Sequence, residues 1–102
     1  MAFLKVAKVG DIAPGRTKIV EIGDEQVALC NVDGQIYAIE NVCTHDDGPL
    51  GQGYLQGEEI ECPRHGAKFN VRTGQVKVLP AITPVPTLEV KIDGDDILVD
   101  AD

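Results

Sequence analysis

The segments Cys43-Thr44-His45 and Cys62-Pro63-Arg64-His65 decide how this chain is organised. Sixteen residues separate them, and each segment supplies one thiol and one imidazole within a few positions. Together they use both histidines and two of the three cysteines of the 102-residue chain. Thiolate and imidazole are ligands for zinc, copper and iron–sulfur centres. The two segments therefore predict a metal centre whose candidate ligands are Cys43, His45, Cys62 and His65.

Zinc and a binuclear iron–sulfur centre are the alternatives for these ligands. Two cysteines and two histidines make an acceptable closed tetrahedral zinc site. The usual zinc pattern places two cysteines in one pair and two histidines in the other, whereas each pair here is mixed. A mixed order suits two loops that each give a cysteine to one iron and a histidine to the other. The order of the ligands favours the binuclear centre over zinc.

Outside these segments, the sequence indicates short β-strands separated by turns. Asp33-Gly34 lies between two apolar-rich runs and predicts a hairpin, because both residues tolerate the positive φ of a type I′ turn. Residues 88–92 alternate strictly between apolar and charged, which predicts a strand with one buried face. No stretch of ten or more residues has helical spacing with a cap and a stop. The expected strands are residues 3–9, 16–22, 26–32, 35–40, 88–92 and 97–99. The sequence predicts an all-β fold, an antiparallel sandwich or small barrel.

The chain length indicates one domain, residues 1–102. Glycines and prolines interrupt the strand pattern in the middle, so we expect a loop-built subdomain at about 43–78, inserted into the sandwich. Glycines in this region are interpreted as turns that aim backbone amides at sulfur, namely Gly48, Gly51, Gly53 and Gly66. Cys30 lies in an apolar strand and is interpreted as a small buried hydrophobe.

Charge and composition exclude several classes of partner. The net charge of −8 argues against nucleic acid or an anionic membrane surface as a partner. No apolar run is long enough for a membrane helix, and the first residues lack the features of a signal peptide. We therefore expect a cytoplasmic protein with reduced thiols. Residues 81–102 carry one base and six acids, which form either a solvated face or a surface that steers the protein to a basic partner. Arg64 and Lys68 are either surface charges or partner contacts.

The pattern C-x-H-x₁₆-C-x₂-H, flanked by Gly48-Pro49-Leu50 and Gly66, resembles the Rieske [2Fe–2S] proteins. The resemblance continues from Cys62 to Gly74 and through Leu79-Pro80-Ala81, so it covers essentially the whole chain. It implies a Rieske fold with one [2Fe–2S] cluster. By this resemblance, Cys43 and Cys62 bind one iron, and His45 and His65 bind the other.

The same resemblance bears on the redox potential, which hydrogen bonds to the sulfurs raise. Ala67 and Phe69 stand where high-potential Rieske proteins have a serine and a tyrosine that donate to sulfur. Gly48 and Arg64 stand where those proteins have cysteines joined by a disulfide. Both departures predict a potential toward the low end of the range for Rieske centres, about −150 to +300 mV.

The resemblance implies a ferredoxin component of an aromatic-ring-hydroxylating dioxygenase system, acting in aromatic hydrocarbon catabolism. Such a protein would be a soluble monomer that carries single electrons from an NADH-dependent flavoprotein reductase to a terminal oxygenase. It would not itself be an enzyme, because a mononuclear iron site needs further histidines and both histidines are already used. The alternatives are a Rieske-type small subunit of a nitrite reductase and a zinc-stabilised binding module.

Overall fold

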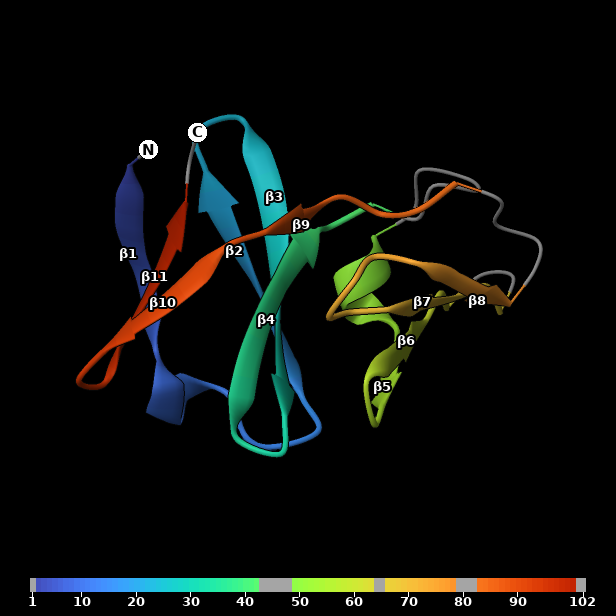
Figure 1. Ribbon diagram of the computed structural model, residues 1–102, viewed down its shortest axis with the longest axis horizontal. Coiled ribbons are helices and arrows are strands. Elements are labelled where there is room, and N and C mark those ends of the chain that lie inside the picture. Colours follow the sequence, from blue (N-terminus) through green and yellow to red (C-terminus); the bar gives the residue numbers. More distant parts are fainter. Residues whose placement is uncertain (1, 43–48, 64–65, 79–82, 101–102) are drawn as a thin grey trace.

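The computed structural model describes residues 2–42, 49–63, 66–78 and 83–100, and its regular structure is almost entirely β (Figure 1). Every strand pairing among these residues is antiparallel, which confirms the predicted fold class. Two short 3₁₀ turns, η1 and η2, accompany the strands. The elements are β1 (Phe3–Lys8), η1 (Val9–Asp11), β2 (Thr17–Ile22), β3 (Glu25–Val32), β4 (Gln35–Glu40), η2 (Leu50–Gln52), β5 (Tyr54–Gln56), β6 (Glu59–Glu61), β7 (Lys68–Asn70), β8 (Val76–Val78), β9 (Thr87–Leu88), β10 (Val90–Asp93) and β11 (Asp96–Asp100).

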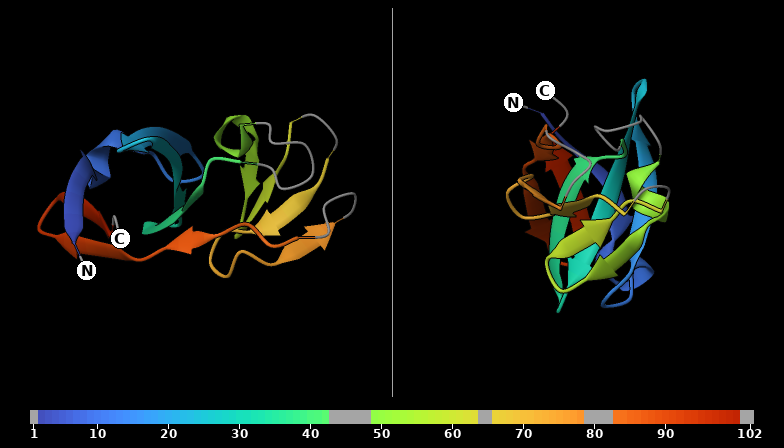
Figure 2. Two further views of the ribbon diagram at one scale, coloured as in Figure 1. Left: turned by 90° about the horizontal axis from the view of Figure 1, so that it is seen from above. Right: turned by 90° about the vertical axis from the view of Figure 1, so that its right-hand side faces the viewer.

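The strands form three sheets, with the orders β1–β11–β10, β2–β3–β4–β9 and β5–β6–β7–β8. The first two sheets curve around a common interior, and we call them together the barrel. The third sheet lies beside the barrel (Figures 1 and 2). In sequence the third sheet falls between β4 and β9, as an insertion does. We call β5–β8 together with η2 the inserted unit. It contains short strands as well as the loops expected from the sequence.

The hairpin between β3 and β4 follows the sequence prediction closely. Val32 pairs with Gln35, so Asp33 and Gly34 form a two-residue turn. Their φ angles are 51° and 96°, and both lie in the left-handed region that a type I′ turn requires. The turn fixes the register of β3 and β4, which is continuous from the Val32–Gln35 pair to the Val27–Glu40 pair.

The run predicted as one strand at 88–92 is divided between two sheets. β9 ends at Leu88 and pairs with β4, whereas β10 begins at Val90 and pairs with β11. Glu89 is the residue at which the chain passes from one sheet to the other. The alternation predicts burial only in part, since Leu88 and Val90 are half-buried but Ile92 is 47% exposed.

Two hydrophobic cores lie on opposite faces of β3. Side chains of a strand alternate between its faces, and here Val27 and Leu29 enter one core while Ala28 and Cys30 enter the other. All four are fully buried, so β3 has no solvent-facing side chain over this run. The inner core of the barrel consists of Ala7, Ile12, Val20, Val27, Leu29, Ile36, Ala38, Ile97 and Val99. The shared core consists of Ala28, Cys30, Ile39, Leu50, Ile60, Cys62, Ala67, Phe69, Val71 and Val85. The shared core is what attaches the inserted unit to the barrel.

Within the described ranges, no helix is long and apolar enough to cross a membrane.

Candidate metal centre

Cys62 follows β6 directly and lies at the base of the turn that leads to β7. Its N–H donates to the carbonyl of Ala67 at 2.7 Å, and its own carbonyl accepts from Gly66 N–H at 3.2 Å. Gly66 has a φ of 75°, which favours glycine, as the turn interpretation of this residue requires. The backbone therefore closes a short loop whose sequence is Cys62-Pro63-Arg64-His65-Gly66.

The thiol of Cys62 is shielded from water and set among apolar side chains. Cys62 is 1% exposed and belongs to the shared core with Ala67 and Phe69, both fully buried. Neither of these neighbours has a side-chain donor. A thiolate here would be stabilised by a bound cation rather than by solvent, which suits a metal ligand.

The predicted ligands Cys43, His45 and His65 lie outside the described residues, as do Gly48, Arg64 and the segment 79–82. Across residues 2–42, 49–63, 66–78 and 83–100, no three histidine, cysteine, aspartate or glutamate side chains gather as a metal site would need. The ligand set therefore stays a prediction, with Cys62 as its described member.

Gly51 and Gly53 are needed for a different reason from the one predicted. The φ of Gly53 is −81°, and Gly51 is not among the residues with positive φ. Their requirement is space. A Cβ on Gly51 would lie 2.8 Å from Cγ1 of Ile19, and one on Gly53 would lie 1.9 Å from the carbonyl oxygen of Glu61. η2 and the Gly53 that follows it are packed too closely against their neighbours for any side chain at these two positions.

Asn41 is a residue of the site region that the sequence analysis did not single out. It is buried and comes two residues before Cys43. Its Oδ1 accepts a hydrogen bond from Gly51 N–H at 2.5 Å, and its Nδ2 donates to Gln26 Oε1 at 3.1 Å. The only sequence signal was its place between a strand end and a candidate ligand, since a buried asparagine needs partners that pattern alone does not reveal.

Cys30 is a buried hydrophobe, as predicted. It is fully buried in the shared core, and burial raises the pKa of its thiol to about 12. Nζ of Lys68 lies 3.8 Å from Oε1 of Glu61 across the β6–β7 pair. This ion pair supports the interpretation of Lys68 as a surface charge.

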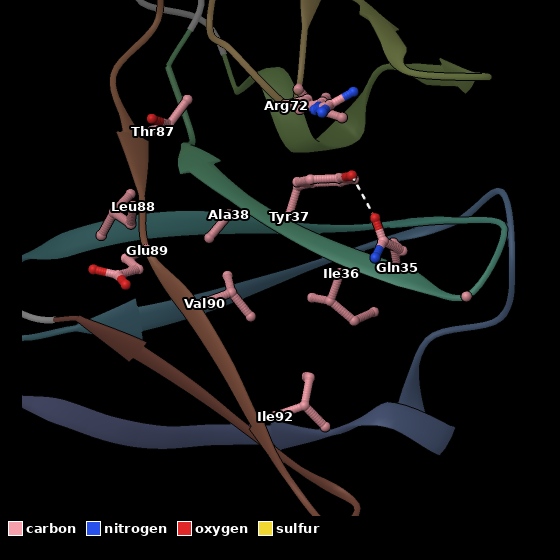
Figure 3. Close-up of a pocket in the computed structure, with 12 residues that line it drawn as sticks. Gln35, Ile36, Tyr37, Ala38, Arg72, Thr87, Leu88, Glu89, Val90 and Ile92 are labelled. Carbon is pink, nitrogen blue, oxygen red and sulfur yellow. Dashed lines mark hydrogen bonds between the residues drawn. The ribbon is translucent and has the colours of Figure 1, made fainter.

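A groove of about 560 Å³ runs along β4, β9 and β10 (Figure 3). Tyr37, Arg72 and Glu89 are among its lining residues, and the Tyr37 hydroxyl donates to Gln35 Oε1 at 2.7 Å. Cys62 does not line it. The groove is therefore separate from the one candidate ligand that the structure describes.

Comparison with known proteins gives consistent matches. The model of the Rieske [2Fe-2S] domain family matches residues 2–89. The ferredoxin component of biphenyl 2,3-dioxygenase from Rhodococcus jostii (strain RHA1) is 47% identical over 98% of this chain and 94% of its own length. The ferredoxin of carbazole 1,9a-dioxygenase from Nocardioides aromaticivorans IC177 has a TM-score of 0.92 at 35% identity, covering 97% of both chains. A chain in a complex of reduced oxygenase and oxidized ferredoxin in carbazole 1,9a-dioxygenase also has a TM-score of 0.92, at 37% identity over 97% of this chain and 93% of that one.

These matches confirm the resemblance, the fold and the cofactor predicted from the sequence, one Rieske-type [2Fe–2S] cluster. The relatives are named as ferredoxin components, which also confirms an electron-transfer component rather than an enzyme. This chain belongs to the Rieske [2Fe-2S] domain family, among the ferredoxin components of aromatic dioxygenase systems.

Proposed function

We propose that this protein is a low-potential Rieske ferredoxin that carries single electrons from an NADH-dependent flavoprotein reductase to a terminal aromatic-ring-hydroxylating oxygenase. The observation that carries the proposal is the 47% identity with a biphenyl dioxygenase ferredoxin component over 98% of the chain. When bound, a [2Fe–2S] cluster accepts and releases one electron, and histidine ligands on one iron raise its potential above that of plant-type ferredoxins.

The proposed cluster ligands are Cys43, His45, Cys62 and His65, on a cluster-binding subdomain of residues 43–78 within the single domain 1–102. Cys62 fits this role, because its buried position and closed backbone loop suit a thiolate bound to metal. The apolar shared core around it would exclude water from that side of the cluster.

A low potential is supported by the neighbours of Cys62. Ala67 and Phe69 are fully buried with it, and their side chains donate no hydrogen bond that would stabilise the reduced cluster. We expect a midpoint toward the lower end of about −150 to +300 mV. A redox titration checks this, and a midpoint well above zero would contradict it.

A terminal oxygenase is the proposed electron acceptor, and the chain would act as a cytoplasmic monomer. The similar carbazole dioxygenase structure contains a ferredoxin together with its oxygenase, which supports this partner. The net charge of −8 favours a basic docking surface on either protein partner.

The test is purification of the protein with its cluster. Its reduction by a reductase and its reoxidation by an oxygenase are then measured separately. We expect a red-brown protein with a rhombic EPR signal on reduction, reduced by a flavoprotein reductase with NADH and reoxidised by an oxygenase. Zinc without iron would favour the binding module instead. Obligate co-purification with a large haem-containing subunit would favour a nitrite reductase small subunit.

A further inference from the structure

We infer that Asn41 and η2 form a brace that sets the position of one ligand segment relative to the other, with Asn41 as its positioning residue. The inference rests on the proposed function, because it takes Cys43 and Cys62 as cluster ligands. It concerns described residues on either side of the first ligand segment and directly before Cys62.

The first end of the brace is fixed to β3. The backbone N–H of Asn41 donates to the carbonyl of Gln26 at 2.9 Å, and its Nδ2 donates to the Gln26 side chain at 3.1 Å. Its Oδ1 accepts from Gly51 N–H at 2.5 Å. Residues 43–48 lie between Asn41 and Gly51 in the sequence. The Asn41–Gly51 hydrogen bond therefore closes the base of the segment that carries two candidate ligands.

A second hydrogen bond holds Gly51 from the side of β2. Thr17 Oγ1 donates to the carbonyl of Gly51 at 2.7 Å, so both the N–H and the carbonyl of this residue are bound to barrel side chains. The barrel also encloses Gly51 tightly, since a Cβ there would lie 2.8 Å from Ile19. Closely packed neighbours leave η2 little room to shift.

The second end of the brace presses against β6. Gly53 N–H donates to the carbonyl of Leu50 at 2.9 Å and closes the 3₁₀ turn. A Cβ on Gly53 would lie 1.9 Å from the carbonyl oxygen of Glu61, the residue directly before Cys62. Backbone therefore meets backbone at this point. A continuous path of hydrogen bonds and tight contacts runs from Asn41 through η2 to the base of the second ligand loop.

Such a brace matters because no disulfide can hold the two segments together. Apart from the two candidate ligand cysteines, the chain has only Cys30, which is buried in β3. Mutation of groups that orient metal ligands from outside the coordination sphere typically lowers metal affinity by about 10–100-fold. Asn41 is placed to act in this way.

The experiment compares two asparagines of matched chemistry. Asn41→Leu removes the acceptor for Gly51 N–H. The control Asn31→Leu removes the other buried asparagine side chain, near the end of β3. Its Oδ1 accepts from Gly34 N–H and its Nδ2 donates to the carbonyl of Ile12, both at 2.7 Å. We expect similar losses of stability in urea. Only Asn41→Leu is expected to change the EPR g-values and to speed cluster loss to a chelator, by about tenfold.

Thr17→Val keeps the inference testable if Asn41→Leu does not fold. It removes only the hydroxyl that donates to Gly51, and we expect a smaller change in the same EPR and cluster-loss measurements. The brace would be overturned if the Asn41 or Thr17 variant matched Asn31→Leu in g-values and rate of cluster loss, while the wild-type cluster and its electron transfer remained intact. A wild-type protein without a rhombic signal would overturn the proposed function, and the brace with it.

Discussion

The backbone of Val85 lies directly against Gly74. Val85 N–H donates to the carbonyl of Gly74 at 2.9 Å, and a Cβ on Gly74 would lie 2.2 Å from the Val85 carbonyl oxygen. Gly74 also has a φ of 81°. In sequence, β8 and the segment 79–82 lie between these two residues. The contact therefore holds the chain where it leaves the inserted unit for β9.

Gly74→Ala should destabilise the protein far more than Gly94→Ala. Both glycines have positive φ, but the space around Gly94 is open. Left-handed backbone alone should cost Gly94→Ala about 1–2 kcal/mol. Gly74→Ala adds a clash with the Val85 carbonyl, for which we expect about 1–3 kcal/mol more. Urea unfolding of the two variants measures the difference, and equal losses would show that Val85 moves aside freely.

Phe69→Tyr and Ala67→Ser should each raise the midpoint potential. Both residues are buried with Cys62, so we expect a new hydroxyl there to donate to sulfur and stabilise the reduced cluster. A net hydrogen bond of about 0.5–1.5 kcal/mol corresponds to about 20–60 mV for one electron. Redox titration checks the shift. Tyr54→Phe is the control, because it removes an exposed hydroxyl from the same sheet and should leave the midpoint unchanged.

Cys30 should resist alkylation in the folded protein. Its thiol is fully buried and has a pKa of about 12, so the reactive thiolate is scarce at neutral pH. Iodoacetamide should modify it only after unfolding. Mass spectrometry of the digested protein gives the extent of labelling at this position. Rapid labelling of Cys30 under native conditions would mean that the shared core opens readily.

Cys30 should also make stability fall at alkaline pH. The pKa of the thiol rises from 9.0 to about 12 on folding, so the unfolded chain loses this proton first. The contribution of this thiol to the free energy of unfolding is fully present below pH 9.0. Between pH 9.0 and about pH 12 it falls by about 1.4 kcal/mol per pH unit.

The matched measurement uses Cys30→Ala, which lacks the titrating thiol. Urea unfolding of both proteins at about pH 8 and about pH 10.5 separates the Cys30 effect from other titrations, since those cancel in the difference. Wild type should lose stability relative to the variant at the higher pH. Parallel pH profiles would contradict a strongly raised pKa.

Local rules were enough to predict the hairpin between β3 and β4. A type I′ turn requires positive φ at both central residues, and few residue pairs other than Asp-Gly tolerate this. Asp33 and Gly34 both have positive φ in the structure, as that turn requires. Glu89 was different. Its alternating neighbours indicate a strand, but β9 on one side pairs with β4, which lies far away in the sequence, whereas β10 on the other side pairs with β11 across a short turn.

The ligand types and the cofactor could be predicted from the sequence, but the contacts that position the surrounding segments could not. Cysteine and histidine spacing carries the ligand types, so the family and cofactor follow from the motif. The roles of Asn41, Gly51 and Gly53 depend on close approach between segments, and no local pattern encodes such contacts. A glycine required by space has the same sequence signature as one required by φ.

The two buried faces of β3 mean that the inserted unit is not a separable module. A peptide cut to the inserted unit would lose the β3 and β4 side chains that complete the core around Leu50 and Ile60. The barrel left behind would expose Ala28 and Cys30 as an apolar strip, a surface that invites aggregation. Transplanting this metal centre into another scaffold would therefore require moving β3 and β4 with it.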